Sequence, residues 1–194
     1  MTKSRADKMA ETRARLIAAG RAAFAQKGYA EASMDDFTGA AGLTRGALYH
    51  NFGGKTGLLQ AVIEQIDGEM LARMAEESAR HDDPWAAFLA EYRAYIRMAL
   101  EPEIQRIVLL DGPAVLGDPS RWPRQLACLD RVRDLIAGLI EDGIVQPVDL
   151  GMAAALLNGA ALNAALLVAG SDAPEATLPR ALDTFERLAE GLRA

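Results

Sequence analysis

The segment that most limits how this chain can fold covers residues 33–55, where two short helices are predicted to meet at a glycine turn. Ser33 stands three residues before Asp36, which is a common N-cap pattern at the start of a helix. Gly42 can adopt the left-handed conformation that ends this helix, and Thr44 can cap a second helix through its hydroxyl group. Two short helices joined in this way are typical of a helix-turn-helix, whose second helix lies in a DNA groove.

The second predicted helix has two different faces. Leu48 and Phe52 stand four residues apart and are expected to face the core. Arg45 and Tyr49 have the same spacing on another face, so a cation and an aromatic ring are exposed together. Such a face suits contact with a nucleic acid, in which phosphates attract cations and base edges accept hydrogen bonds.

These residues resemble the DNA-binding segment of the TetR family of bacterial transcriptional regulators. The matching features are Ser33, the turn Ala41-Gly42-Leu43-Thr44, Gly46, the run Leu48-Tyr49-His50-Asn51-Phe52, Lys55 and Leu58, together with Ile17, Ala22, Phe24, Gly28 and Tyr29 upstream. The similarity is specific over residues 10–60 and is architectural beyond them. Phe37 and Thr38 depart from the family, which commonly has an aliphatic residue followed by Ala, and Asn51 stands where a second aromatic residue or His is frequent.

The chain is predicted to be all-α. Every long segment has the helical period of hydrophobic residues, and no useful length of strand-like alternation occurs. The resemblance implies about nine helices, three and then six. It places a three-helix DNA-binding domain at residues 1–55 and a larger helical ligand-binding and dimerisation domain at residues 56–194.

The distribution of charge agrees with this division. The net charge is −6 over 194 residues. Residues 1–57 hold nine basic and five acidic side chains, a net charge of +4, whereas residues 58–194 hold twelve and twenty-two, a net charge of −10. A basic head on an acidic body is typical of a polyanion-binding module that carries a separate second domain.

Composition excludes several other classes of protein. A lone cysteine, Cys128, permits no internal disulfide, and two histidines form no cluster of metal ligands, so no cofactor or metal is expected. No apolar signal region follows Met1, which favours a cytoplasmic protein. Residues 150–169 lack charge and could cross a bilayer by length, but their Ala, Gly and Asn content and acidic flanks favour a buried helix and no membrane partner.

For DNA, Arg45 is the predicted base reader, because its planar fork can contact guanine O6 and N7 together. The alternative is a solvated arginine on a surface helix. Gly46 permits close approach of the backbone to the groove, although a turn role would also explain it. The remaining candidates are expected to contact phosphates: Tyr49, His50, Lys55 at a helix N-terminus, and Ser33 and Thr44, which are caps first.

A ligand pocket in the larger domain would combine apolar walls with a few orienting polar groups. The candidates of this kind are Trp85, Tyr92, Tyr95, Arg106, Asp111, Trp122, Gln125, Asn158 and Asn163. Core packing is the alternative for each aromatic residue. Arg106 and Asp111 bracket an apolar run, where a charge needs a partner, and a structural pair between them would satisfy this need.

Two late segments are predicted to form a dimer interface, because small side chains let helices approach closely. The candidates are Leu156, Leu157, Ala160, Ala161, Ala164, Leu178, Leu182, Phe185 and Leu188. The alternative is that both helices close the core of their own domain. The family resemblance favours dimerisation, and a two-fold dimer predicts a palindromic operator.

The functional prediction is a homodimeric repressor that binds a double-stranded DNA operator and is released by a small, largely apolar effector. The alternatives are an effector-independent dimeric DNA-binding protein and an all-helical enzyme. No enzyme is expected, because neither histidine has a plausible nucleophile partner and no carboxylate pair has a recognisable spacing.

Overall fold

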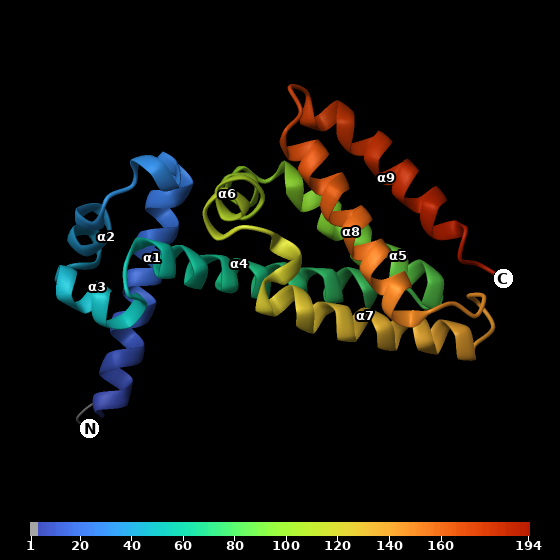
Figure 1. Ribbon diagram of the computed structural model, residues 1–194, viewed down its shortest axis with the longest axis horizontal. Helices are drawn as coiled ribbons and strands as arrows, with labels where there is room; N and C mark the ends of the chain where they lie inside the picture. Colours follow the sequence, from blue (N-terminus) through green and yellow to red (C-terminus); the bar gives the residue numbers. More distant parts are fainter. Residues whose placement is uncertain (1–3) are drawn as a thin grey trace. The chain divides into compact units, whose positions relative to one another are not determined.

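The computed structural model describes residues 4–194, apart from the side chains of residues 123–126. Its described part contains no β-strand and has nine α-helices: α1 (Arg5–Glu31), α2 (Met34–Ala41), α3 (Arg45–Phe52), α4 (Lys55–Ser78), α5 (Pro84–Arg97), α6 (Gly112–Leu116), α7 (Pro123–Glu141), α8 (Leu150–Ala169) and α9 (Pro174–Glu190) (Figure 1). A 3₁₀ turn (Met98–Leu100) and a π-helix (Ile104–Asp111) lie between α5 and α6, and a second 3₁₀ turn (Pro119–Arg121) precedes α7. The predicted all-α class is confirmed.

The helices form two compact units whose limits differ from the sequence-based division. One unit takes in the chain up to Ile66 together with Arg106–Gly117, and the other contains Asp67–Gln105 and Asp118–Ala194. The boundary predicted at residue 55 therefore falls inside the first unit, which also holds the first half of α4. Most of the π-helix and all of α6 belong to this unit as well.

The first unit is built around α1, against which α2 and α3 pack. Leu16, Phe24, Phe37 and Leu48 are fully buried in its core. Gly20 allows α4 to approach, since a Cβ at this position would lie 2.8 Å from the Leu58 side chain. The short helices α2 and α3 therefore pack on a helix that is capped at its N-terminus by Ser4 and that lies in close contact with α4.

The residues that depart from the family pattern are accommodated within this core. The Phe37 ring lies 5.1 Å from the Phe24 ring, between centroids. The buried Thr38 hydroxyl donates to the Met34 carbonyl oxygen at 3.0 Å, and the Asn51 amide donates to the Ala47 carbonyl oxygen at 2.8 Å. Each polar side chain is thus satisfied within its own helix.

In the second unit α8 packs on α5, α7 and α9 (Figure 1). Aromatic rings form a continuous row through this core. The ring centroids of Trp85 and Phe88 are 5.5 Å apart, those of Phe88 and Tyr92 are 5.2 Å apart, and those of Tyr92 and Phe185 are 4.9 Å apart. Pairs at such distances stabilise a core beyond the area they bury.

The prediction of a buried helix at residues 150–169 is correct for only one of its faces. Ala154, Ala165 and Val168 are buried, whereas Leu156 and Leu167 are exposed. Among the described helices, α8 alone is long and apolar enough to cross a bilayer, and 39% of its most apolar stretch is buried within the chain. Its small residues let three other helices pack against it.

Candidate functional site

The two helices of the turn motif are fixed at both ends by hydrogen bonds. The Ser33 hydroxyl accepts from the Asp36 N–H at 3.2 Å, and the Asp36 carboxylate accepts from the Ser33 N–H at 2.8 Å. Gly42 has a φ of 60° and ends α2, and the Thr44 hydroxyl accepts from the Ala47 N–H at 3.2 Å to start α3. The predicted caps are confirmed.

Residues of α1 hold these helices in place. The Arg15 guanidinium donates to the Ala41 carbonyl oxygen at the end of α2. The Arg13 guanidinium carbon lies 4.7 Å from the centroid of the Phe52 ring at the end of α3. Helix α3 is therefore anchored through its apolar face and its C-terminus, and its opposite face stays open.

The open face of α3 carries Arg45, Gly46, Tyr49 and His50, all of them exposed. A Cβ at Gly46 would meet only the Thr44 hydroxyl oxygen, at 3.7 Å, and the backbone there is not left-handed. The chain's own packing therefore does not require glycine at this position. Close approach of another molecule to the backbone would explain it.

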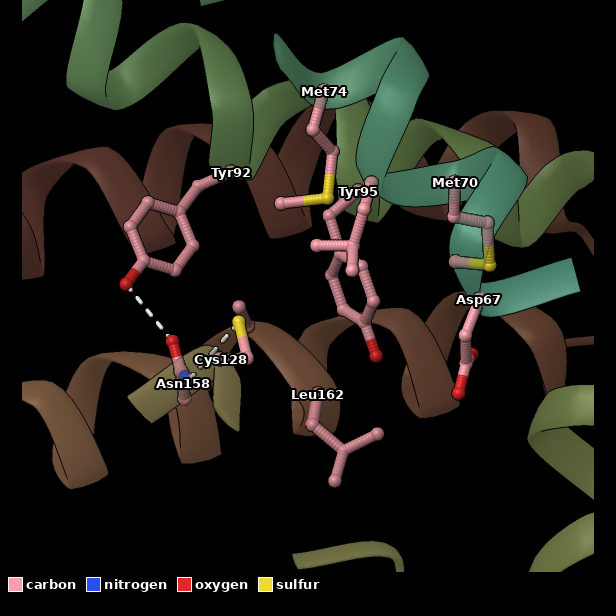
Figure 2. Close-up of a pocket in the computed structure, with 10 residues that line it drawn as sticks. Asp67, Met70, Met74, Tyr92, Tyr95, Cys128, Asn158 and Leu162 are labelled. Atoms are coloured by element: carbon pink, nitrogen blue, oxygen red, sulfur yellow. Dashed lines mark hydrogen bonds between the residues drawn. The ribbon is translucent and has the colours of Figure 1, made fainter. Parts of the chain in front are cut away.

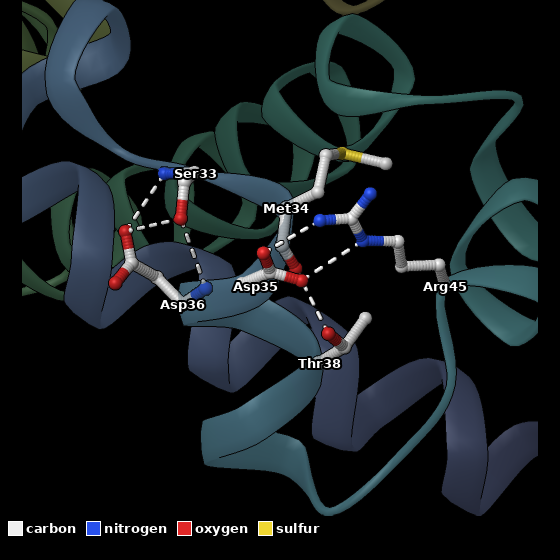
Figure 3. Close-up of polar contacts among 6 residues, drawn as sticks. All are labelled: Ser33, Met34, Asp35, Asp36, Thr38 and Arg45. Carbon is white, nitrogen blue, oxygen red and sulfur yellow. Dashed lines mark hydrogen bonds and ion pairs between the residues drawn. The ribbon is translucent and has the colours of Figure 1, made fainter.

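Arg45 makes a two-pronged ion pair with Asp35 across the corner of the motif (Figure 3). Its Nε donates to Asp35 Oδ1 at 2.8 Å, and its Nη2 donates to Oδ2 at 2.5 Å. These bonds lower the pKa of Asp35 and raise that of Arg45. Asp35 is not among the predicted site residues, because no spacing rule for a single helix joins residues on two helices.

Lys55, the first residue of α4, is already engaged inside the first unit. Its Nζ donates to the Ala30 carbonyl oxygen at 3.2 Å and lies 4.3 Å from the centroid of the Tyr29 ring. The Tyr29 hydroxyl in turn lies 2.9 Å from the Thr56 hydroxyl oxygen. A phosphate contact by Lys55 would have to share the ammonium group with these partners.

The second unit contains an apolar pocket that is partly open to solvent. Its walls come from α4, α5, α7 and α8 (Figure 2). The lining residues are Asp67, Met70, Leu71, Met74, Tyr92, Tyr95, Cys128, Asn158, Ala161 and Leu162. Methionine side chains and tyrosine rings provide flat, polarisable walls that adapt to an apolar ligand.

The pocket contains two phenols, one amide and one thiol. The Tyr92 hydroxyl donates to Asn158 Oδ1 at 2.9 Å, and Asn158 Nδ2 lies 3.9 Å from Cys128 Sγ (Figure 2). Burial raises the pKa of Tyr92, of Tyr95 and of the Cys128 thiol. The two phenols therefore stay protonated at neutral pH, and the thiol is not an activated nucleophile.

Comparison with known proteins identifies the family. The model described as "Bacterial regulatory proteins, tetR family" matches residues 16–62, and the model described as "Tetracyclin repressor-like, C-terminal domain" matches residues 85–192. The chain belongs to the TetR family of transcriptional regulators. It is thus a DNA-binding regulator with a helix-turn-helix head.

Individual relatives agree with this assignment. The crystal structure of a TetR-family regulator from Pectobacterium atrosepticum is 46% identical, covers 99% of this chain and 98% of its own, and superposes with a TM-score of 0.89. The structure of RolR in complex with resorcinol is 23% identical, covers 95% and 90% of the two chains and has a TM-score of 0.71, so it shows the fold alone. The regulator TtgR of Pseudomonas putida is 41% identical over 76 residues, which are 38% of this chain and 36% of TtgR. The match therefore spans little more than a third of TtgR.

Three of the predicted ligand residues line the pocket of this TetR-family protein: Tyr92, Tyr95 and Asn158. Trp85 instead lies in the core, where its indole N–H donates to Glu190 at 2.7 Å. Trp122 and Asn163 do not line the pocket either, and the Gln125 side chain lies outside the described residues. Apolar lining residues such as Met70 and Met74 were missed because their helical spacing equally fits a core stripe.

Arg106 and Asp111, which were predicted ligand residues, do not line this pocket, and their side chains contact the backbone of α1. Both belong to the first unit and bind the backbone on either side of Gly28. Arg106 Nη2 donates to the Lys27 carbonyl oxygen at 3.1 Å, and Asp111 Oδ2 accepts from the Tyr29 N–H at 2.7 Å. Both charged side chains thus have backbone hydrogen-bond partners, so an ion pair between them is not required.

Some of the predicted dimer residues are buried inside their own chain. Leu157, Ala161, Ala164 and Phe185 are at most 9% exposed, because α8 and α9 turn these positions toward the other helices of the unit. These four side chains therefore pack in the core of the second unit of their own chain. The other candidates lie at or near the surface: Leu156, Ala160, Leu178, Leu182 and Leu188.

An apolar strip of α8 and α9 remains exposed beside these residues. Met152, Leu156 and Leu167 are exposed on α8, as is Leu188 on α9. A groove between the two helices is lined by Ala160, Asn163, Ala164, Leu167, Thr177, Arg180, Ala181, Thr184, Phe185 and Leu188. Large apolar side chains gathered beside small ones on one face are typical of a protein interface.

Proposed function

We propose that this protein is a ligand-responsive repressor that binds a palindromic operator as a homodimer and is released by a small, largely apolar molecule. The proposal rests on the presence of two features in one chain. Helix α3 is anchored and has an open polar face, and the second unit holds an apolar pocket. The first feature suits a DNA groove, and the second suits a small molecule.

On DNA, Arg45 would read a base and the other exposed residues of the motif would hold the backbone. Tyr49 and His50 lie on the open face of α3, and the Ser33 and Thr44 hydroxyls lie at helix N-termini, where anions are favoured. Lys55 would add an ammonium group close to the start of α4. Gly46 would let the α3 backbone approach the groove.

The effector would be uncharged, flat or flexible, and would carry a hydroxyl or carbonyl group. The apolar walls contributed by Met70 and Met74 favour such a molecule, and the protonated hydroxyls of Tyr92 and Tyr95 can donate to it. Resorcinol, which RolR binds, has this chemistry: an aromatic ring with two hydroxyl groups. Phenols are therefore a suitable first panel of effectors.

The exposed apolar strip of α8 and α9 would bind a second copy of the chain about a two-fold axis. An interface of this symmetry pairs each patch with itself and sets two identical heads on two half-sites, which requires a palindromic operator. The effector would shift the dimer away from the DNA-binding conformation only as far as its affinity differs between the two conformations.

The proposal is tested by selecting bound sequences from genomic fragments with the purified full chain and then titrating the selected duplex. We expect a palindromic site whose affinity falls steeply with salt, because phosphate contacts release counterions. Phenols should lower operator affinity for the parent chain but less for Asn158→Leu, which removes the amide at the pocket wall. Trp85→Phe, a core substitution outside the pocket, is the control.

Three results would contradict parts of the proposal. Failure to select any sequence would remove the DNA-binding role. A site without two-fold symmetry would remove the homodimeric assignment. Binding that no member of an effector panel changes, with no shift in melting temperature, would favour an effector-independent DNA-binding protein.

A further inference from the structure

The ion pair between Arg45 and Asp35 uses one particular side of the guanidinium group. Nε and Nη2 of Arg45 both donate to the carboxylate, at 2.8 and 2.5 Å. The N–H groups at the far end, on Nη1 and Nη2, form a second fork that points away from Asp35, and Figure 3 shows the third nitrogen directed away from the carboxylate. This second fork is free of Asp35 and has the geometry that contacts guanine O6 and N7.

We propose that Asp35 is a positioning residue for sequence recognition: it orients Arg45 toward guanine and reduces its attraction to phosphates. The inference rests on the proposed function, because it requires that α3 enters a DNA groove. The proposal assigns discrimination between bases to Arg45 and Asp35 together, whereas the sequence pointed to Arg45 alone.

The backbone on both sides of the pair is well fixed. Asp35 is the second residue of α2 and lies inside the capping box that Ser33 and Asp36 form. Arg45 is the first residue of α3, directly after its cap at Thr44. With both helix starts held by hydrogen bonds, the ion pair restricts the side-chain torsions of Arg45 before DNA arrives, and preorganisation of this kind lowers the entropic cost of binding.

Stability of the fold gives no sufficient reason for this pair. The side chains of Arg45 and Asp35 are 64% and 70% exposed, and exposed ion pairs contribute little to folding. A cation in the first turn of α3 is also unfavourable for the helix, because the positive end of the helix dipole lies there. Arg45 therefore occupies a position that suits DNA contact better than it suits the helix.

The charge of Asp35 has a second effect on DNA binding. Next to Arg45 the carboxylate makes the pair neutral overall, so the guanidinium attracts any phosphate less strongly. A lone arginine would bind backbone phosphates on every sequence with similar affinity. The pair thus weakens non-specific binding to DNA and strengthens the preference for one base.

The test compares Asp35→Asn, Arg45→Ala and the parent chain on three kinds of DNA at several salt concentrations. These are the selected operator, operators changed at the base whose preference depends on Arg45, and an unrelated duplex. Glu101→Gln is the matched control, since Glu101 forms a two-pronged pair with Arg73 at 3.0 and 2.5 Å in the second unit. Melting temperatures of all variants are measured alongside.

We expect Arg45→Ala to lower the preference for guanine at that base by about 5- to 150-fold. Asp35→Asn should lower it by about 3- to 10-fold while strengthening binding to the unrelated duplex, because a freed arginine is less restricted and carries an uncompensated charge. The salt dependence on that duplex should become steeper by about 0.9 for each bound protomer, which corresponds to one additional phosphate contact per Arg45. Glu101→Gln should match the parent chain in every respect.

The inference is wrong if Asp35→Asn keeps the preference and the salt dependence of the parent chain. It is also wrong if this variant weakens all DNA equally with a lower melting temperature, which would indicate a structural role. Should Arg45→Ala keep the parent preference, the inference fails while the proposed regulator stands. If the parent chain selects no sequence at all, the proposed function fails as well.

Discussion

Asp36 is half-buried and makes several polar contacts. Its carboxylate accepts from the Ser33 N–H at 2.8 Å, from the Ser33 hydroxyl at 2.9 Å and from Lys27 Nζ at 2.7 Å. The Lys27 hydrogen bond and those from Ser33 lower the pKa of Asp36 from 3.8 to about 2. This residue therefore links the start of α2 to the end of α1.

Asp36 should make the stability of the first unit depend on pH in the acid range. Because its pKa is lower in the folded chain, the carboxylate stabilises the fold fully above its unfolded value of 3.8, and this contribution is lost as the pH falls toward about 2. We expect Asp36→Asn to be less stable than the parent chain at pH 7, with the difference shrinking over that interval. Urea unfolding at several pH values measures it, and a difference that does not change with pH would contradict the assignment.

At the scale of elements, Gly28 marks the corner that ends the main run of α1. Its φ of 77° is left-handed, and a Cβ there would lie 2.6 Å from Arg106 Nη2. Arg106 and Asp111, from the π-helix Ile104–Asp111, bind the backbone on either side of it. A segment distant in sequence thus completes the DNA-binding unit, because it forms hydrogen bonds with the backbone groups at this corner.

We expect Gly28→Ala to destabilise the chain by about 1–3 kcal/mol, because alanine is strained in the left-handed region and its Cβ displaces Arg106. Gly39→Ala is the matched control. Gly39 lies inside α2, where a Cβ would meet no neighbouring side chain within 4 Å, so this change should stabilise the chain by about 0.5–1 kcal/mol. Denaturant unfolding of both variants measures the effects, and equal effects of the two substitutions would show that the corner is not constrained.

Sequence patterns predicted the local features of the elements and missed the contacts between distant ones. The caps at Ser33 and Thr44 were predictable because their partners stand three residues away. The partner of Asp111 is separated from it by 82 residues, and no periodicity connects them. The pocket was predicted in part, since Tyr92 and Asn158 stand out as polar groups while Met74 does not differ from a core residue.

At the scale of the whole molecule, the proposed dimer would determine how two DNA-binding heads reach an operator. Four large apolar side chains on α8 and α9 are more than 60% exposed: Met152, Leu156, Leu167 and Leu188. Exposed groups of this kind are stabilised when a second copy covers them. In the proposed dimer, two heads would bind two half-sites together, and the joint affinity would exceed that of one head because the second contact is intramolecular.

Leu156→Arg should therefore separate the protomers of the proposed dimer, because an unpaired charge buried at its two-fold interface would cost about 3–5 kcal/mol. Sedimentation velocity should show a monomer where the parent chain is a dimer, and affinity for the full palindrome should fall toward that for a single half-site. Leu110→Arg is the matched control, since Leu110 is also an exposed apolar residue, at 48% exposure, but belongs to the first unit. A Leu156→Arg chain that still sediments as a dimer would place the interface elsewhere on the molecule.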